Sequence, residues 1–100
     1  MSPQFRLTEP AIRDIEQIAD RIAQQSGLER SEQFLDRLDA KLAKIVSFPY
    51  LGRARDEILP GMRSLGIDSY LILYLSIQQE LEVLRVVSGY QDLPELFKDI

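Results

Sequence analysis

Two amphipathic stripes follow one another in the first half of the chain, and a single glycine stands between them. Apolar residues recur at steps of three and four over residues 9–26 and again over residues 34–46. This spacing predicts two α-helices. Gly27 is a natural stop for the first helix, and Pro49 bars continuation of the second. Because the connection is so short, we expect a hairpin of antiparallel helices.

The second half of the chain changes to strand-like runs. Residues 62–67, 70–76 and 81–88 are predicted strands, and the middle run is nearly all apolar, as in a strand covered on both faces. The short connections between the runs predict an antiparallel meander. A weaker alternating signal, at residues 5–7, precedes the first helix.

Two irregular segments complete the chain. Residues 49–61 hold two prolines and two glycines and are predicted to form a loop. Residues 92–100 are expected to form one or two helical turns, with Asp92 as the cap and Pro94 in the first turn. The expected fold is therefore α+β, in the order β-α-α-β-β-β(-α), with the hairpin packed on an antiparallel sheet as one domain over residues 1–100.

Composition excludes several kinds of chemistry. The chain has no cysteine and no histidine, which removes disulfides, thiolate sites and the usual metal ligand and general base, so no cofactor is expected. Its net charge of −4 argues against autonomous binding of DNA or RNA. No apolar run reaches the ~20 residues of a membrane span. Since the first residues also lack the layout of a signal peptide, we expect a cytoplasmic protein.

Five sequence pieces in this order resemble the ParE/RelE toxin superfamily, and the ParE branch more closely. They are Ala11 with Asp14-Ile15; Phe34, Leu38 and Leu42; the loop from Pro49-Tyr50-Leu51-Gly52-Arg53 to Ile58 with Met62-Arg63; Tyr70-Leu71-Ile72-Leu73-Tyr74; and Val83-Leu84-Arg85-Val86-Val87-Ser88-Gly89. Two positions depart from the pattern. Many relatives carry a histidine where this chain has Ser88 and an arginine where it has Tyr90.

The resemblance implies the toxin half of a type II toxin–antitoxin system, as in plasmid stabilisation. A ParD-like, DNA-binding antitoxin would neutralise the toxin in a hetero-oligomer, and DNA gyrase would be the target. ParE-branch toxins act by binding protein, whereas RelE-branch toxins cleave messenger RNA on the ribosome. A ribosome-dependent RNase therefore stays open as an alternative, and so does a degenerate module without toxicity.

Four arginines are candidate contacts with a partner or target. Arg63 and Arg85 interrupt apolar strand runs, and Arg53 and Arg55 lie on the glycine-flanked loop. Each guanidinium could meet a carboxylate or a phosphate. The alternative for the strand arginines is a structural pair with Asp14, Asp56 or Glu57, or a side chain whose stem packs while its guanidinium reaches water. For the loop arginines the alternative is a solvated loop held by ion pairs with Asp56 and Glu57.

The end of the chain supplies the other candidates. Tyr90 could stack on a base, although a tyrosine at the end of a strand more often caps the core. Leu93, Leu96 and Phe97 form an apolar face at helical spacing. If this face is docked it closes the core, and if undocked it offers a patch to a partner. Few basic residues lie between positions 50 and 97, which favours protein binding over an RNA groove.

Overall fold

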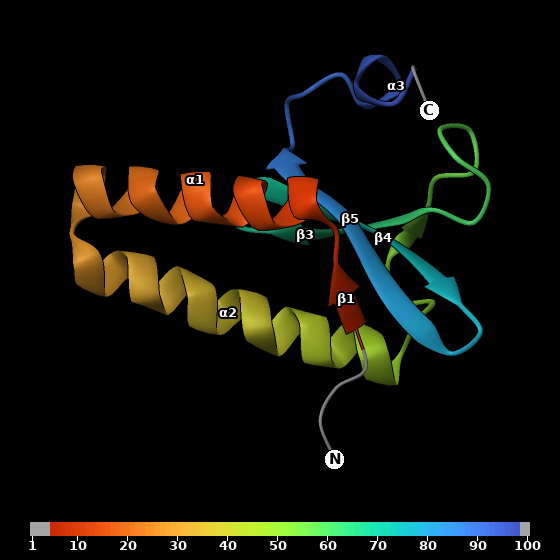
Figure 1. Ribbon diagram of the computed structural model, residues 1–100, viewed down its shortest axis with the longest axis horizontal. Helices are drawn as coiled ribbons and strands as arrows, with labels where there is room; N and C mark the ends of the chain where they lie inside the picture. Colours follow the sequence, from red (N-terminus) through yellow and green to blue (C-terminus); the bar gives the residue numbers. More distant parts are fainter. Residues whose placement is uncertain (1–4, 99–100) are drawn as a thin grey trace.

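The computed structural model describes residues 5–98 and consists of a helical hairpin on one face of a twisted sheet (Figure 1). The five strands lie in the order β1-β5-β4-β3-β2. The elements in chain order are β1 Phe5–Leu7, α1 Glu9–Ser26, α2 Leu28–Ser47, β2 Arg53–Ala54, β3 Arg63–Ile67, β4 Tyr70–Ile77, β5 Glu80–Ser88 and α3 Leu93–Leu96. The expected helical hairpin and α+β class are confirmed.

The hairpin begins and turns where its capping residues stand. Thr8 caps α1: its hydroxyl oxygen accepts a hydrogen bond from the Ala11 N–H at 3.1 Å and donates to the Leu84 carbonyl of β5 at 2.7 Å. One side chain thus starts the helix and ties it to the sheet. Gly27 ends α1 and precedes α2 with a φ of 96°, a conformation that favours glycine.

The sheet is mixed, which corrects the expectation of an antiparallel one. β3, β4 and β5 form the predicted meander, but β1 pairs parallel with β5. The chain leaves β1, passes through both helices and then through β2, β3 and β4, and returns on β5 parallel to β1. A fifth strand, β2, forms inside the segment predicted to be a loop and pairs antiparallel with the start of β3.

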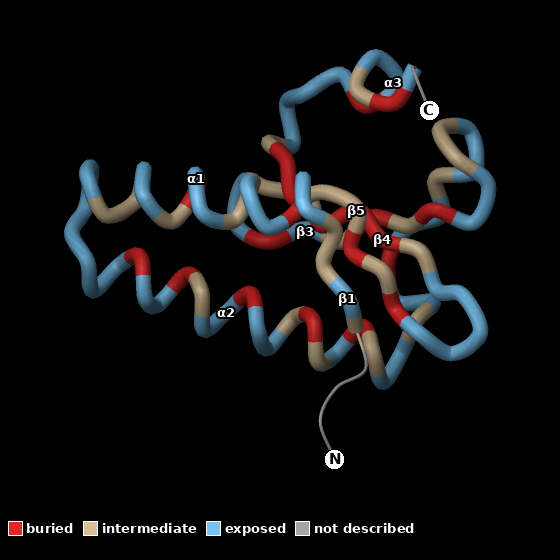
Figure 2. The backbone as a smooth tube through the Cα atoms, in the orientation of Figure 1, coloured by how far each residue is buried: buried red, intermediate tan, exposed pale blue. Residues whose placement is uncertain are grey.

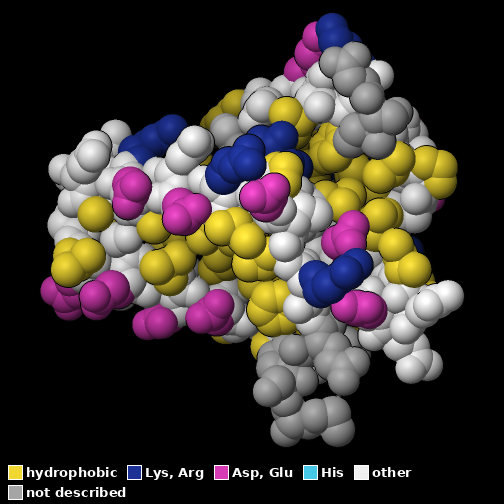
Figure 3. Space-filling model, viewed as in Figure 1, with side chains coloured by type: hydrophobic (Ala, Val, Ile, Leu, Met, Phe, Trp, Pro, Cys, Tyr) yellow, Lys and Arg dark blue, Asp and Glu magenta, His cyan; other side chains and the backbone are white. Residues whose placement is uncertain are grey.

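Two apolar clusters lie on opposite faces of the sheet, because Ile72 and Tyr74 of β4 belong to one and the intervening Leu73 to the other. Figure 2 marks the buried residues along the chain. The larger one joins the helices to the sheet and contains, among others, the fully buried Phe34, Ile45, Ile72 and Val83. Hydrophobic side chains fill the line between α1 and α2, and acidic side chains lie on the outer sides of the helices (Figure 3). Each helix therefore turns its apolar stripe inward, as the spacing predicted.

The second cluster covers the face that two helices cannot reach. Met62, Leu73 and Val87 pack there against Leu93 and Phe97. α3 therefore acts as a lid on this face, and its N-cap is Asp92, as predicted, with Pro94 in its first turn. In residues 5–98 no helix has the length and apolar character needed to cross a membrane.

Candidate functional site

The segment 49–55, here called the arginine loop, leaves α2 and enters the sheet as β2. Tyr74, a buried residue of β4, holds it in place. Its hydroxyl accepts a hydrogen bond from the Gly52 N–H and donates one to the Pro49 carbonyl, both at 2.9 Å. A buried phenol needs such partners, and here they fix the path of the loop.

Position 52 has room for glycine alone. A Cβ there would lie 2.6 Å from the Tyr74 hydroxyl oxygen and 2.9 Å from the Ser64 carbonyl oxygen. These separations are far below van der Waals contact, so the glycine of the Pro-x-x-Gly-Arg pattern allows the loop to approach the sheet. Burial raises the pKa of Tyr74, and the Gly52 N–H and the charge of Arg63 act in the opposite direction.

Arg63, the first residue of β3, binds the arginine loop through its guanidinium. Its Nη1 donates to the Gly52 carbonyl at 2.7 Å and to the Tyr50 carbonyl at 3.3 Å, and its guanidinium lies 4.9 Å from the centre of the Tyr50 ring. The contacts combine charge-assisted hydrogen bonds with a cation–π interaction. Arg63 is thus a structural clamp whose Nη1 donates to the protein's own backbone.

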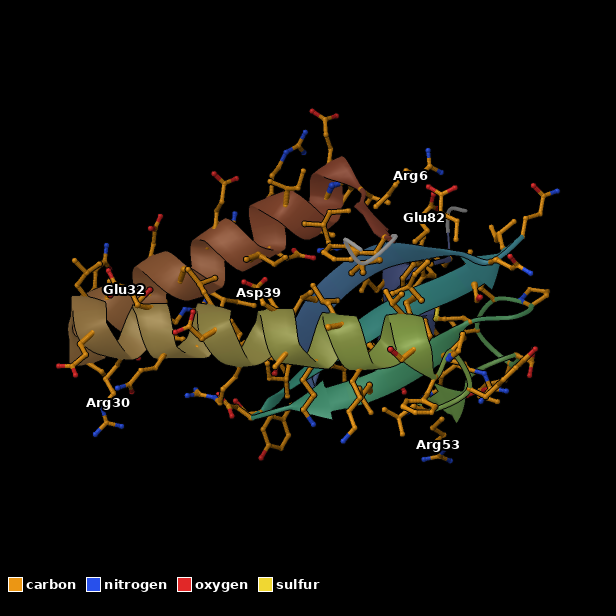
Figure 4. The ribbon with its side chains drawn as sticks, turned by 90° about the horizontal axis from the view of Figure 1, so that it is seen from below. Arg6, Arg30, Glu32, Asp39, Arg53 and Glu82 are labelled. Carbon is orange, nitrogen blue, oxygen red and sulfur yellow. The ribbon has the colours of Figure 1, made fainter. Side chains whose placement is uncertain are left out.

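The two loop arginines differ in what they contact. Arg55 is held by the Ser64 hydroxyl at 2.9 Å and lies 3.8 Å from the Glu57 carboxylate. Arg53 is exposed and extends from the sheet edge into solvent (Figure 4). Of the four candidate arginines, Arg53 is the one that the fold presents most freely to a partner.

Three apolar side chains stand beside Arg53 along the chain and remain in water. Phe48, Tyr50 and Leu51 are 63%, 81% and 44% exposed. Together with Arg53 they form what we call the loop patch. Aromatic residues and arginine are the residue types enriched at the centres of protein interfaces. The patch is therefore suited to contact another polypeptide.

Arg85 lies elsewhere, where β5 meets α1. Its guanidinium binds the Asp14 carboxylate through two hydrogen bonds, at 2.6 Å from Nε and 2.9 Å from Nη2. The hydrogen bond to Asp14 raises the pKa of Arg85 above its usual value. The same carboxylate accepts the Val86 N–H at 3.0 Å. Arg85 was expected either to contact an anionic group of a partner or to form an internal ion pair, and the structure shows the internal ion pair with Asp14.

The candidates near the end of the chain separate into exposed and covered groups. Tyr90 is 93% exposed, so the expectation that it caps the core is wrong. The chain turns at Gly89 as β5 ends, which carries the ring away from the body. Leu93 and Phe97 are buried and Leu96 is half-buried against the second cluster, so this apolar face is docked. Their role as partner contacts remains a prediction.

The four candidate arginines do not converge on one site: Arg53, Arg55 and Arg63 lie at the arginine loop, and Arg85 lies where β5 meets α1. Comparison with known proteins decides the family. The model of the family described as "ParE toxin of type II toxin-antitoxin system, parDE" matches residues 5–93. The chain belongs to the ParE toxin family.

Individual ParE relatives align with this chain over most of their length. The chain is 31% identical over 94 residues to Toxin ParE1 of Mycobacterium tuberculosis, covering 93% of this chain and 96% of that protein. It is 24% identical over 86 residues to Toxin ParE3 of Caulobacter vibrioides, with 86% of each covered. In a solved structure described as the chromosomal ParDE TA system from P. aeruginosa, one chain shares the fold at a TM-score of 0.73 and 18% identity, over 85% of this chain and 94% of that one.

Two features of this ParE-family fold were not predicted from the sequence. The first is the role of Tyr74, which the sequence places in a strand motif without a partner. A tyrosine in an otherwise apolar strand signals that a polar group must meet it, but the signal does not say which one. The second is the loop patch, because Phe48 and Leu51 read as ordinary apolar residues until the fold leaves them uncovered.

Proposed function

We propose that this ParE-family toxin acts by binding DNA gyrase and is not a nuclease, and that a ParD-like, DNA-binding antitoxin neutralises it in a hetero-oligomer. One observation carries the choice between binding and RNA cleavage. Both strand arginines are occupied within the fold, Arg85 by the Asp14 carboxylate and Arg63 by two backbone carbonyls. The action is expected in the cytoplasm, where gyrase works.

An RNase without histidine would depend on such arginines. They would have to stabilise the charge that develops on the phosphorane. The pair with Asp14 compensates the charge of Arg85 and engages two of the five N–H donors of its guanidinium. Arg85 would have to leave Asp14, which would strand a carboxylate that is only 12% exposed in its side chain. This cost supports the binding role.

The loop patch is a second and independent observation in favour of a binding role. Exposed aromatic and aliphatic side chains that neighbour an exposed arginine in the chain offer a protein partner both an anchor to bury and a charge at the rim of the interface. We propose that gyrase is contacted there. Nothing in this arrangement requires the protein to move a proton or form a covalent bond.

Induced production without the antitoxin tests the proposal. We expect growth arrest with filamentation and a DNA-damage response, while translated messenger RNA stays intact. Two variants sharpen the test. Tyr50→Ser with Arg53→Ser is expected to abolish arrest, whereas Tyr90→Ser, which removes an exposed tyrosine outside the loop patch, is expected to retain it. Rapid cleavage of translated messages would support an RNase, and an absence of any effect would support a module without toxicity.

The antitoxin part of the proposal has its own test. We expect a small DNA-binding protein to be encoded next to this chain and to copurify with it when both are produced together. Coproduction should also abolish the growth arrest. If the neighbouring reading frames encode no such protein, or if the protein encoded there neither binds nor protects, the paired system is wrong.

A further inference from the structure

The last part of β5 has a helix, and no strand, along its outer edge. β1 pairs with residues 81–83, whereas β5 continues to Ser88. Beyond that pairing the Asp14 carboxylate of α1 accepts the Val86 N–H at 3.0 Å. Figure 1 shows β5 ending beside α1. Side chains of α1 therefore stand where a neighbouring strand would otherwise supply backbone groups.

The Ser88 N–H points to the same side as the Val86 N–H. Alternate residues of a strand direct their backbone groups to the same side. The Val86 N–H meets α1, whereas Gly89 donates its N–H to the Ser69 carbonyl next to β4, at 2.9 Å. Among residues 5–98 no side chain or loop carbonyl accepts the Ser88 N–H. This donor is therefore left for a ligand.

A cavity of about 260 Å³ lies between α1 and this end of β5. It is large compared with the ~30 Å³ that one water molecule occupies in the liquid, so it has room for a small molecule. Six side chains with hydrogen-bond donors line it, namely Gln17, Arg21, Tyr70, Arg85, Ser88 and Gln91.

The one carboxylate in the lining is already engaged. Asp14 accepts two hydrogen bonds from Arg85 and one from the Val86 N–H. Arg21 is exposed and takes part in none of the ion pairs among residues 5–98. Two guanidinium groups minus one carboxylate give the cavity a charge of +1, against −4 for the whole sequence. The cavity is therefore rich in donors and has a cation to spare.

We infer that this cavity binds a phosphate group, either as the free ion or on a small phosphorylated molecule. Phosphate oxygens accept hydrogen bonds in several directions, and the donors here come from α1, from β5 and from Gln91. Arginine is the side chain that matches phosphate best, through charge-assisted hydrogen bonds. A carboxylate has only two oxygens and would leave more of the donors unmet.

The inference goes beyond the proposed function and does not depend on it. None of the loop-patch residues lines the cavity. A bound phosphate would join α1 to the end of β5 and to Gln91, the residue before the N-cap of α3. Because it binds the folded chain only, phosphate should also raise the midpoint of thermal unfolding.

A titration of the full chain with sodium phosphate tests the site by NMR, with sodium chloride holding the ionic strength constant. We expect the Ser88 amide and the Arg21 side-chain Nε–H resonances to shift together along one curve that saturates in the low millimolar range. Sodium chloride alone should shift neither. The absence of these shifts, or shifts that rise without saturation, would overturn the inference.

Three ligands distinguish the chemical classes and the source of the phosphate. Acetate should bind about tenfold more weakly than inorganic phosphate, since it carries fewer acceptors and less charge. Tighter binding of glycerol 3-phosphate than of inorganic phosphate supports a phosphorylated molecule as the ligand, and the reverse order supports the free ion. Acetate that binds as tightly as both contradicts a phosphate site.

Removal of one guanidinium tests the cation of the site. Arg21→Gln should weaken phosphate binding about tenfold. Arg13→Gln is the matched control, because it removes the same charge from an exposed position of α1 that does not line the cavity. If the two variants lose affinity equally, phosphate responds to the overall charge of the protein and the site is wrong.

A larger side chain at position 88 tests the place of binding without any change in charge. Ser88→Leu should fill the cavity and abolish both phosphate binding and the rise in the thermal midpoint, whereas Ser88→Ala should bind within about twofold of the unsubstituted protein. Circular dichroism verifies that both variants are folded. A folded leucine variant that binds phosphate normally places the ligand elsewhere and refutes the inference. If the leucine variant does not fold, the comparison of Arg21→Gln with Arg13→Gln decides.

Discussion

Arg85 of β5 holds Asp14 of α1 with two hydrogen bonds, at 2.6 and 2.9 Å, and both side chains are mostly shielded from water. The Asp14 carboxylate also accepts the Val86 N–H. One acidic side chain therefore ties the first helix to the last strand at a point where the sequence places a charge among apolar residues.

Replacing that carboxylate with an amide is expected to destabilise the protein. In Asp14→Asn the Arg85 charge loses its partner in a largely dry site, so the free energy of unfolding should fall by about 2–4 kcal/mol. The exposed pair between Arg37 and Asp68 supplies the control, since Asp68→Asn should cost less than about 1 kcal/mol. Urea denaturation measures both. Equal losses would show that the buried pair has no special structural role.

Gly52 is predicted to be intolerant of any side chain. In Gly52→Ala the Cβ would clash with the Tyr74 hydroxyl and the Ser64 carbonyl, and the loop must move to relieve it. We expect a loss of about 2–3 kcal/mol in the free energy of unfolding. Gly66→Ala places the same methyl group in open space and should change stability by less than about 0.5 kcal/mol. Thermal melts that rank the two variants the other way would refute the packing described for the arginine loop.

The Tyr74 hydroxyl should make stability depend on pH in the alkaline range. Burial raises its pKa above 10.0 in the folded protein, so the folded state keeps the proton where the unfolded chain begins to lose it. The resulting contribution is complete below about pH 10 and is lost as the pH rises through the higher, folded-state pKa.

Tyr74→Phe exposes this dependence by removing the group. At neutral pH the variant should be less stable by about 1–3 kcal/mol, because the Gly52 N–H and the Pro49 carbonyl lose their partner. The difference from the unsubstituted protein should narrow as the pH rises above about 10 and passes through the folded-state pKa. Chemical denaturation across this range measures it, and a difference that stays constant or widens runs against the expected sign.

The short helix α3 is predicted to contribute to stability because it closes the second cluster. Leu93→Ala should lower the free energy of unfolding by about 2–3 kcal/mol, since the side chain is buried against the sheet. Tyr90→Ala, three residues earlier and almost fully exposed, should change it by less than about 0.5 kcal/mol. Comparable stabilities of the two variants would mean that α3 is undocked in solution.

Much of the fold was predictable because it rests on periodicity. The three- and four-residue steps of the first half define α1 and α2, and Gly27 marks the boundary between them. The meander followed from apolar runs with short connections. The sequence motifs also contain the residues that fix the arginine loop. One hydrogen-bonded unit in the structure joins Pro49, Gly52, Arg63 and Tyr74, all of which belong to those motifs.

What the sequence did not predict depends on contacts between distant segments. β2 has two residues and no alternation, and it exists because β3 offers an edge and Tyr74 holds the chain beside it. The parallel pairing of Phe5–Leu7 with β5 depends on the path of the whole chain. For Arg85 the sequence allowed a ligand or an internal carboxylate, and only the position of Asp14 in space shows the internal pair.

Purified DNA gyrase provides the most direct test of a toxin that works by binding. The protein, titrated into a supercoiling reaction, should inhibit gyrase and leave a translated messenger RNA intact in a parallel reaction. The double variant Tyr50→Ser with Arg53→Ser should lose the inhibition although it remains folded. Undiminished supercoiling at a large molar excess of the protein, together with cleavage of the message, would contradict the account.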